Sequence, residues 1–118
     1  MTEPKPPRTY DEFVGTFPEA GAAWEILGRA GRAGPLDAKH CELVKLGIAI
    51  ASGSEGAVHS AVRKSRSAGA SLAEQQQVLL LCASTIGLPA TVAAFTWMRD
   101  EGDGARRDSR RTGEKSPS

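Results

Sequence analysis

The segment SEGAVHSA, residues 54–61, holds the side chains of this chain that are best suited to acid–base chemistry. Glu55 and His59 are four residues apart, and on a helix this spacing places both side chains on one face. A carboxylate beside an imidazole can orient the ring and set which nitrogen carries the proton. Glu42, on the preceding predicted helix, is the candidate second acid. We therefore predict Glu42, Glu55 and His59 as the catalytic residues of an acid–base site.

The same three residues have ordinary structural explanations, and these stay open. A Glu–His pair at this spacing is common on helix surfaces, where it contributes only about 0.2–0.5 kcal/mol. His59 lies at the boundary of the apolar face of its helix. Glu42 stands near the start of an apolar helix, where the helix dipole favours an acid. His40 is expected to face solvent.

No metal or cofactor site is predicted. A Glu-x-x-x-His pair supplies at most two metal ligands, and no further Cys/His cluster is visible. No phosphate-binding motif is present either. The two cysteines, Cys41 and Cys82, are expected to stay reduced in a cytoplasmic protein. Cys82 follows three leucines, which favours packing as a small apolar residue over a redox role.

The bulk composition narrows the possible partners. The chain has 118 residues, enough for one domain, and a net charge of +1, which gives no field for nucleic acid. No apolar stretch reaches the ~20 residues that a membrane helix needs, and no signal peptide is apparent. We therefore expect a soluble protein that binds neither nucleic acid nor membrane.

Helical patterns fill the middle of the chain and predict an all-α fold. The proline-rich segment 1–12 and the charged tail 101–118 lack the apolar residues needed to offset their ordering entropy, so both are predicted to be disordered. The helical domain is then expected over 13–100. Capping and breaking residues divide it into about five helices. The first runs from Pro18 to before Gly34-Pro35, the second over 37–52 with Asp37 as its N-cap, and the third over 55–68, ending at Gly69. The fourth begins with a capping box of Ser71 and Glu74 and stops at Gly87, and the last covers 89–99.

The helix predicted over 37–52 ends almost without a polar face, from Leu46 to Ala51. A helix of this kind is normally buried on every side. A domain of roughly 90 residues has a marginal core of its own. We therefore predict a homo-oligomer in which a second subunit covers part of this helix.

The order of the segments CELVKLGIAIA, EGAVH and AGASLAEQQQVLLLCASTIGLPA resembles the carboxymuconolactone decarboxylase and alkylhydroperoxidase D-like family. The resemblance extends over about residues 20–99. It implies an all-helical fold and, as is common in the family, assembly into trimers or hexamers. In the thiol branch of this family, a glutamate, two cysteines and a histidine form a redox site.

Aligned without a gap on that pattern, Glu42 matches the glutamate, whereas Ser54 and Ala57 occupy the cysteine positions and Ala61 the histidine position. A shifted register puts His59 on the histidine position, but it places Ser52 and Glu55 on the cysteines. In either register the redox motif is expected to be lost, and with it the thiol peroxidase activity, because that chemistry needs an attacking thiolate and a resolving thiol.

Three functions remain, in descending order of preference. The first is a cofactor-free acid–base lyase or isomerase acting on a small organic acid, as in the decarboxylase branch of the family. The second is a non-catalytic oligomeric binding protein that keeps the fold. The third is a thiol-dependent peroxidase that uses Cys41 or Cys82. An enzyme is expected to show Glu42, Glu55 and His59 converging on a cavity, with perturbed pKa values, whereas a binding scaffold need not.

Overall fold

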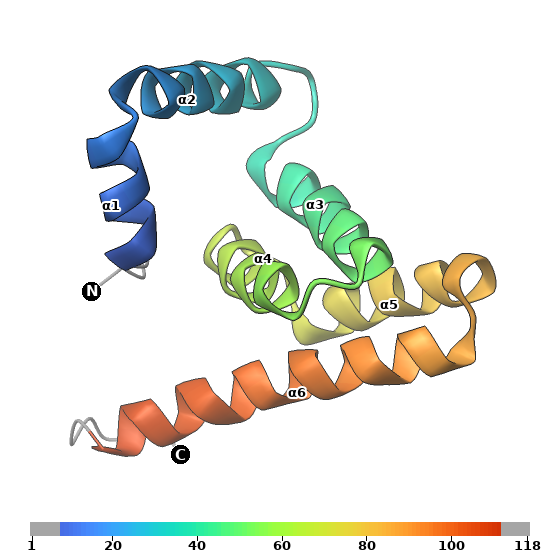
Figure 1. Cartoon of the computed structure of the whole chain (residues 1–118). Coiled ribbons are helices and arrows are strands. Elements are labelled where there is room, and N and C mark those ends of the chain that lie inside the picture. The colour runs from blue at the N-terminus through green and yellow to red at the C-terminus, as the bar shows by residue number, and fades with distance from the viewer. Residues whose placement is uncertain (1–7, 112–118) are drawn as a thin grey trace. The chain divides into compact units, whose positions relative to one another are not determined.

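The computed structural model describes residues 8–111, and their side chains over residues 9–102. The described residues form helices and connecting turns and no strand, which confirms the all-α prediction. Six helices follow one another, against about five predicted (Figure 1). They are α1 (Arg8–Thr16), α2 (Pro18–Arg32), α3 (Ala38–Ser52), α4 (Glu55–Ser67), α5 (Leu72–Ile86) and α6 (Leu88–Arg111). No helix among the described residues is long and apolar enough to cross a membrane.

The chain divides into two compact units, one within residues 1–41 and one within residues 42–118. In the first unit, α1 packs against α2. Pro18 stands in the first turn of α2, as predicted, where its missing N–H costs nothing. Gly21 allows the two helices to approach, because a Cβ built there would lie 2.7 Å from Cγ1 of Val14. A larger residue at position 21 would therefore require the Val14 side chain or the helix packing to shift.

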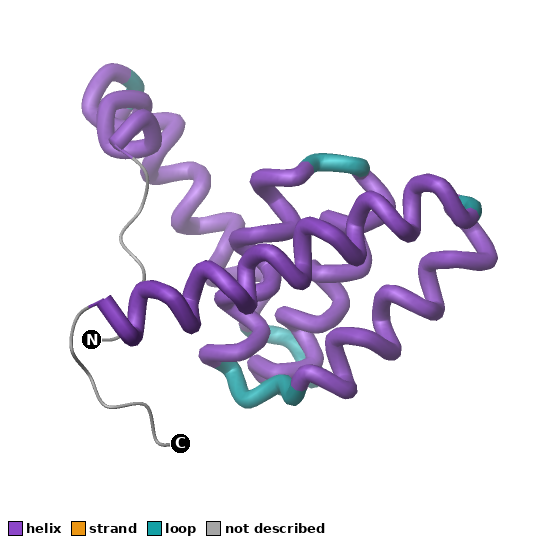
Figure 2. The backbone as a smooth tube through the Cα atoms, turned by 90° about the horizontal axis from the view of Figure 1, so that it is seen from below, coloured by secondary structure: helices purple, strands orange, loops and turns teal. Residues whose placement is uncertain are grey.

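The second unit contains the core and the candidate site. Helix α6 packs against both α4 and α5 (Figure 1), and short loops join the helices of this unit (Figure 2). Helix α3 reaches the same core from residue 42 onwards. The core residues come from all four helices: Leu46, Ala49, Ile50, Val58, Ala61, Val62, Leu79, Ala94 and Met98.

The predicted helix starts of this unit are confirmed in detail. Gly53 has φ 72°, which suits glycine in the turn between α3 and α4. Ser54 then caps α4, and its hydroxyl accepts the backbone N–H of Ala57 at 3.2 Å. The predicted capping box of Ser71 and Glu74 is present at the start of α5, with both reciprocal hydrogen bonds formed.

The start of α3 is capped by Asp37, as predicted. Its Oδ1 accepts the backbone N–H of His40 at 2.9 Å and lies 2.6 Å from Nδ1 of the same residue. The pKa of Asp37 is lowered, first by the hydrogen bond from that backbone N–H and then by the imidazole contact. His40 itself is exposed, as expected.

The ends of the helical region differ from the prediction. Helix α1 begins at Arg8, inside the segment 1–12 that was predicted to be disordered. Helix α6 continues to Arg111, well past the predicted end near Arg99 and into the tail predicted as 101–118. Residues 1–7 and 112–118 lie outside the described residues. The continuation of α6 from Arg99 to Glu101 has a physical reason: Glu101 is held by two side chains of α4, and composition alone does not reveal such a contact.

Within this single chain, α3 is not buried on every side. Val44 and Ile48 are one turn apart on its surface and are 53% and 62% exposed. Burial of their face therefore requires a contact beyond those made by the described residues. That a second subunit provides it stays a prediction.

Candidate functional site

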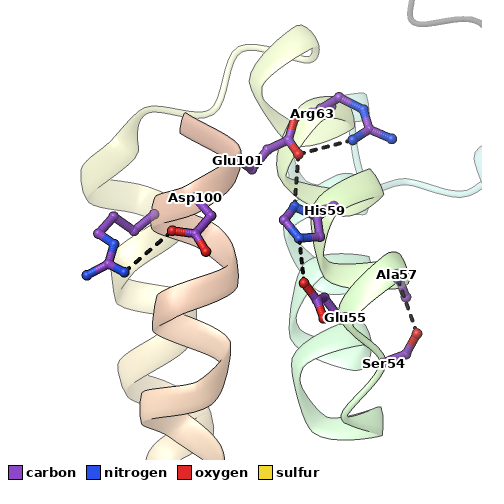
Figure 3. Close-up of polar contacts among 8 residues, drawn as sticks. Ser54, Glu55, Ala57, His59, Arg63, Asp100 and Glu101 are labelled. Carbon is purple, nitrogen blue, oxygen red and sulfur yellow. Dashed lines mark hydrogen bonds and ion pairs between the residues drawn. The ribbon is translucent and has the colours of Figure 1, made fainter. Parts of the chain in front are cut away.

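His59 lies between two carboxylates in the seam between α4 and α6 (Figure 3). Its Nδ1 is 2.9 Å from Oε1 of Glu101, and its Nε2 is 3.3 Å from Oε2 of Glu55. Arg63 completes the cluster, since its Nη1 donates to the same Oε1 of Glu101 at 3.2 Å. The four residues define what we name the His59 cluster.

Two elements position the cluster. Glu55, His59 and Arg63 follow one another at intervals of four on α4, so they share one helix face. Glu101 comes from α6, which packs along α4. The two carboxylates differ in environment: the side chain of Glu101 is 18% exposed, whereas that of Glu55 is 60% exposed. Glu101 is therefore the fixed partner of the ring, and Glu55 is the partner that can turn into solvent.

The protonation state of the His59 ring determines which of its two contacts are hydrogen bonds. A neutral imidazole has one N–H donor and one acceptor nitrogen, whereas an imidazolium has two donors. A carboxylate only accepts, so both contacts of His59 are hydrogen bonds only when the ring is charged. A neutral ring with its proton on Nδ1 would donate to Glu101, the more buried carboxylate, and would leave the lone pair of Nε2 facing Glu55. Such a lone pair is what a general base needs.

Of the three predicted site residues, the structure brings two together. Glu55 and His59 meet as their spacing predicted. No hydrogen bond or ion pair joins Glu42 to either of them among the described residues. Oε1 of Glu42 is instead buried with no hydrogen-bond partner within the described part of the chain, an arrangement that is costly for a charged carboxylate.

Sequence reasoning missed Glu101 and Arg63. The signal for Arg63 was present, because it continues the interval of four that already joined Glu55 to His59. Glu101 gave no such signal, since it lies 42 positions from His59 and was assigned to the charged tail. Contacts between residues that are distant in sequence depend on how α6 packs.

The positions aligned with the redox motif have structural roles of their own here. Ser54 is the N-cap of α4, Ala57 is exposed in the first turn, and Ala61 is buried in the core. Among the described residues, no group of three or more His, Cys, Asp or Glu side chains is arranged to hold a metal ion.

Both cysteines are free thiols and are partly buried. Sγ of Cys41 lies 3.5 Å from the carbonyl oxygen of Leu36, and Sγ of Cys82 lies 3.8 Å from that of Gly47. Burial raises the pKa of the Cys82 thiol, because desolvation disfavours the thiolate. Cys82 also packs against the core, as predicted.

We expect alkylation of Cys82 by iodoacetamide to begin at higher pH than alkylation of an unstructured cysteine. The thiolate is the reacting form, and a raised pKa delays its appearance as the pH increases. The measurement is the alkylation rate against pH in a Cys41→Ser variant, with the urea-unfolded protein as the reference. A folded-state profile at or below that of the unfolded chain would contradict this expectation.

Comparison with known proteins gives one finding. The chain matches the model of a protein family, the carboxymuconolactone decarboxylase family, over residues 18–100. The match includes α2 to α5, most of the described side chains of α6, and three of the four residues of the His59 cluster. A search of the curated proteins and a search of the solved structures each found no significant match.

Proposed function

This chain belongs to the carboxymuconolactone decarboxylase family, and we propose that it is a cofactor-free acid–base enzyme, a lyase or isomerase of a small organic acid. His59 is the general base. We expect the protein to be a cytoplasmic homo-oligomer, either a trimer or a hexamer. The third possibility, a thiol peroxidase, has the least support, because burial disfavours the thiolate of Cys82.

The observation that carries the proposal is the contact between Nδ1 of His59 and Glu101 at 2.9 Å. A general base works when a second group fixes its orientation and tautomer. Glu101 fits this positioning role because it is largely buried and is itself held by Arg63. The sequence had assigned the role to Glu55, which the structure places on the opposite nitrogen.

Glu55 then has a different task. Its side chain is exposed and its contact with Nε2 is long, at 3.3 Å. When Glu55 turns into solvent, Nε2 becomes accessible to a proton on the carbon beside the substrate's carboxyl or lactone group. Proton transfer leaves the electron pair of the broken C–H bond on the substrate as an enolate, and the imidazolium is stabilised by Glu101 on Nδ1. The imidazolium then returns the proton to another carbon of the substrate, which completes an isomerisation.

The test is a Glu101→Gln variant, with Glu55→Gln as its matched control, since each removes one carboxylate charge from the same ring. We expect Glu101→Gln to lower kcat by about tenfold or more with little change in KM, because an amide no longer fixes the tautomer. Nitrogen-15 NMR of the ring should show proton on Nδ1 in the natural protein and a mixture of tautomers in Glu101→Gln. The assay is conversion of the carboxymuconolactone that the family is named after, or deuterium exchange into it.

Unchanged tautomers and unchanged kcat in Glu101→Gln would contradict the positioning role. A larger loss of kcat in Glu55→Gln than in Glu101→Gln would assign the positioning role to Glu55, as the sequence had indicated.

A second candidate function has one specific observation in its favour. Both ring nitrogens of His59 already have carboxylate partners, which is also the arrangement of an ion cluster that only ties α6 to α4. In that case the protein is a non-catalytic oligomer that keeps the family fold. It would show no conversion or exchange in the natural protein, and Glu101→Gln would lower the stability of the fold alone.

A further inference from the structure

A cavity of about 180 Å³ lies where the end of α4 and the start of α5 meet α6. None of the His59 cluster lines it. Its apolar lining comes from Leu72, Phe95 and Met98, and its polar lining includes Arg66 and Arg99. The cavity thus combines an apolar floor with two cationic side chains, and nothing in the proposed function uses it.

One of the two arginines is held in place by a buried side chain. Gln75 is 1% exposed, and its amide nitrogen donates to the carbonyl oxygen of Val62 at 3.1 Å and to Oγ of Ser65 at 2.8 Å. These two bonds fix the amide, whose Oε1 then accepts from Nε of Arg66 at 3.3 Å. Gln75 thereby orients the guanidinium at the wall of the cavity.

The hydrogen bond to Gln75 uses only Nε of Arg66. Among the described residues, no hydrogen bond or ion pair uses the two terminal nitrogens of Arg66, and a carboxylate can take both in a bidentate pair. Arg99 adds a second positive charge. Its one described partner is its neighbour Asp100, at 3.4 Å and with both side chains more than half exposed, a contact too weak to neutralise it.

The size and the lining of the cavity restrict the ligand. An enclosed apolar cavity of ~150 Å³ accommodates benzene. The pocket of this chain has a similar volume but is open to solvent, since Leu72 and Phe95 are 54% and 44% exposed, and this size suits a single aromatic ring with a small substituent. Phe95 can contact such a ring in an edge-to-face or offset geometry, and the Met98 sulfur also favours aromatic neighbours. The two guanidinium groups require that the substituent be an anion.

We propose that this cavity binds a small aromatic monocarboxylate of about the size of benzoate, with the ring against Phe95 and Met98 and the carboxylate on Arg66. Arg99 contributes charge at the mouth of the site. The proposal does not depend on His59 being catalytic, and its test measures binding and not turnover.

The test uses the full chain and the methyl group of Met98 as the reporter. The chain has only two methionines, so a Met98→Leu variant assigns the signal in a carbon-13 methyl NMR spectrum. We expect benzoate to shift this signal in a saturable way. Benzyl alcohol, which has the same ring and no charge, should bind about tenfold or more weakly, since a hydrogen bond to a charged group is worth more than one to a neutral group.

Arg66→Gln should weaken benzoate binding by about tenfold or more. Its matched control is Lys64→Gln, which removes the same charge from an exposed side chain of the same helix outside the cavity; it should change the affinity by less than about twofold, because solvent screens a distant exposed charge. Arg66→Lys keeps the charge without the bidentate geometry, so it should give an intermediate loss.

Three results would overturn the proposal. The first is that the Met98 signal shows no saturable shift up to the solubility limit of benzoate. The second is that benzoate and benzyl alcohol bind with equal affinity. The third is that Arg66→Gln and Lys64→Gln lose equal affinity for benzoate. If circular dichroism shows that Arg66→Gln does not fold, the benzoate affinities of Arg66→Lys and Lys64→Gln are compared instead.

Discussion

Replacing His59 with alanine is expected to lower kcat by about 10²- to 10⁴-fold, the usual cost of losing a positioned general base. No other imidazole lies in the His59 cluster, and carboxylates in water are weak bases at neutral pH. The measurement is the rate at which carboxymuconolactone is converted, or the rate of deuterium exchange at the carbon beside its carboxyl group. Both are measured at saturating substrate. Circular dichroism and light scattering should show an unchanged helix content and an unchanged oligomer size.

The chain offers a matched control, because it has only two histidines. His40 is exposed and contacts Asp37 at the start of α3, so His40→Ala should leave kcat within about twofold of its original value. Equal activity of the His59→Ala variant and the natural protein would refute the general-base proposal. A natural protein without any measurable conversion or exchange would favour the non-catalytic oligomer.

Replacing Ile48 with glutamate is expected to dissociate the predicted homo-oligomer. Ile48 is 62% exposed in the single chain, on the face of α3 that it shares with Val44. If a second subunit covers this face, the new carboxylate is buried without a partner, at a cost of about 3–5 kcal/mol. That cost corresponds to a loss of about 10²- to 4 × 10³-fold in the association constant.

Sedimentation or light scattering at micromolar concentration measures the effect. The control is Gln77→Glu, which adds the same charge on an exposed polar position of α5 and should leave the oligomer intact. A natural protein that is a well-folded monomer at this concentration would exclude the oligomer altogether. An oligomer that tolerates Ile48→Glu would place the subunit contact elsewhere.

The local features of this fold could be predicted from the sequence because each depends on residues a few positions apart. Asp37 and Ser71 mark the starts of α3 and α5 by side-chain capping. Gly69 and Gly87, both with positive φ, mark the ends of α4 and α5. The pairing of Glu55 with His59 follows from helix geometry in the same way.

Only the tertiary structure decided how the candidate site is completed. Glu101 lies 42 positions from His59 and reaches it because α6 packs along α4. The same packing gives α6 a reason to continue past Arg99, where composition had indicated a disordered tail. Glu42 shows the converse, because its place in the sequence suggested a second acid, yet no described contact links it to His59. Residue types and spacings determine helices and neighbours on one helix face, whereas the partners of a side chain across a helix seam depend on the packing of the whole core.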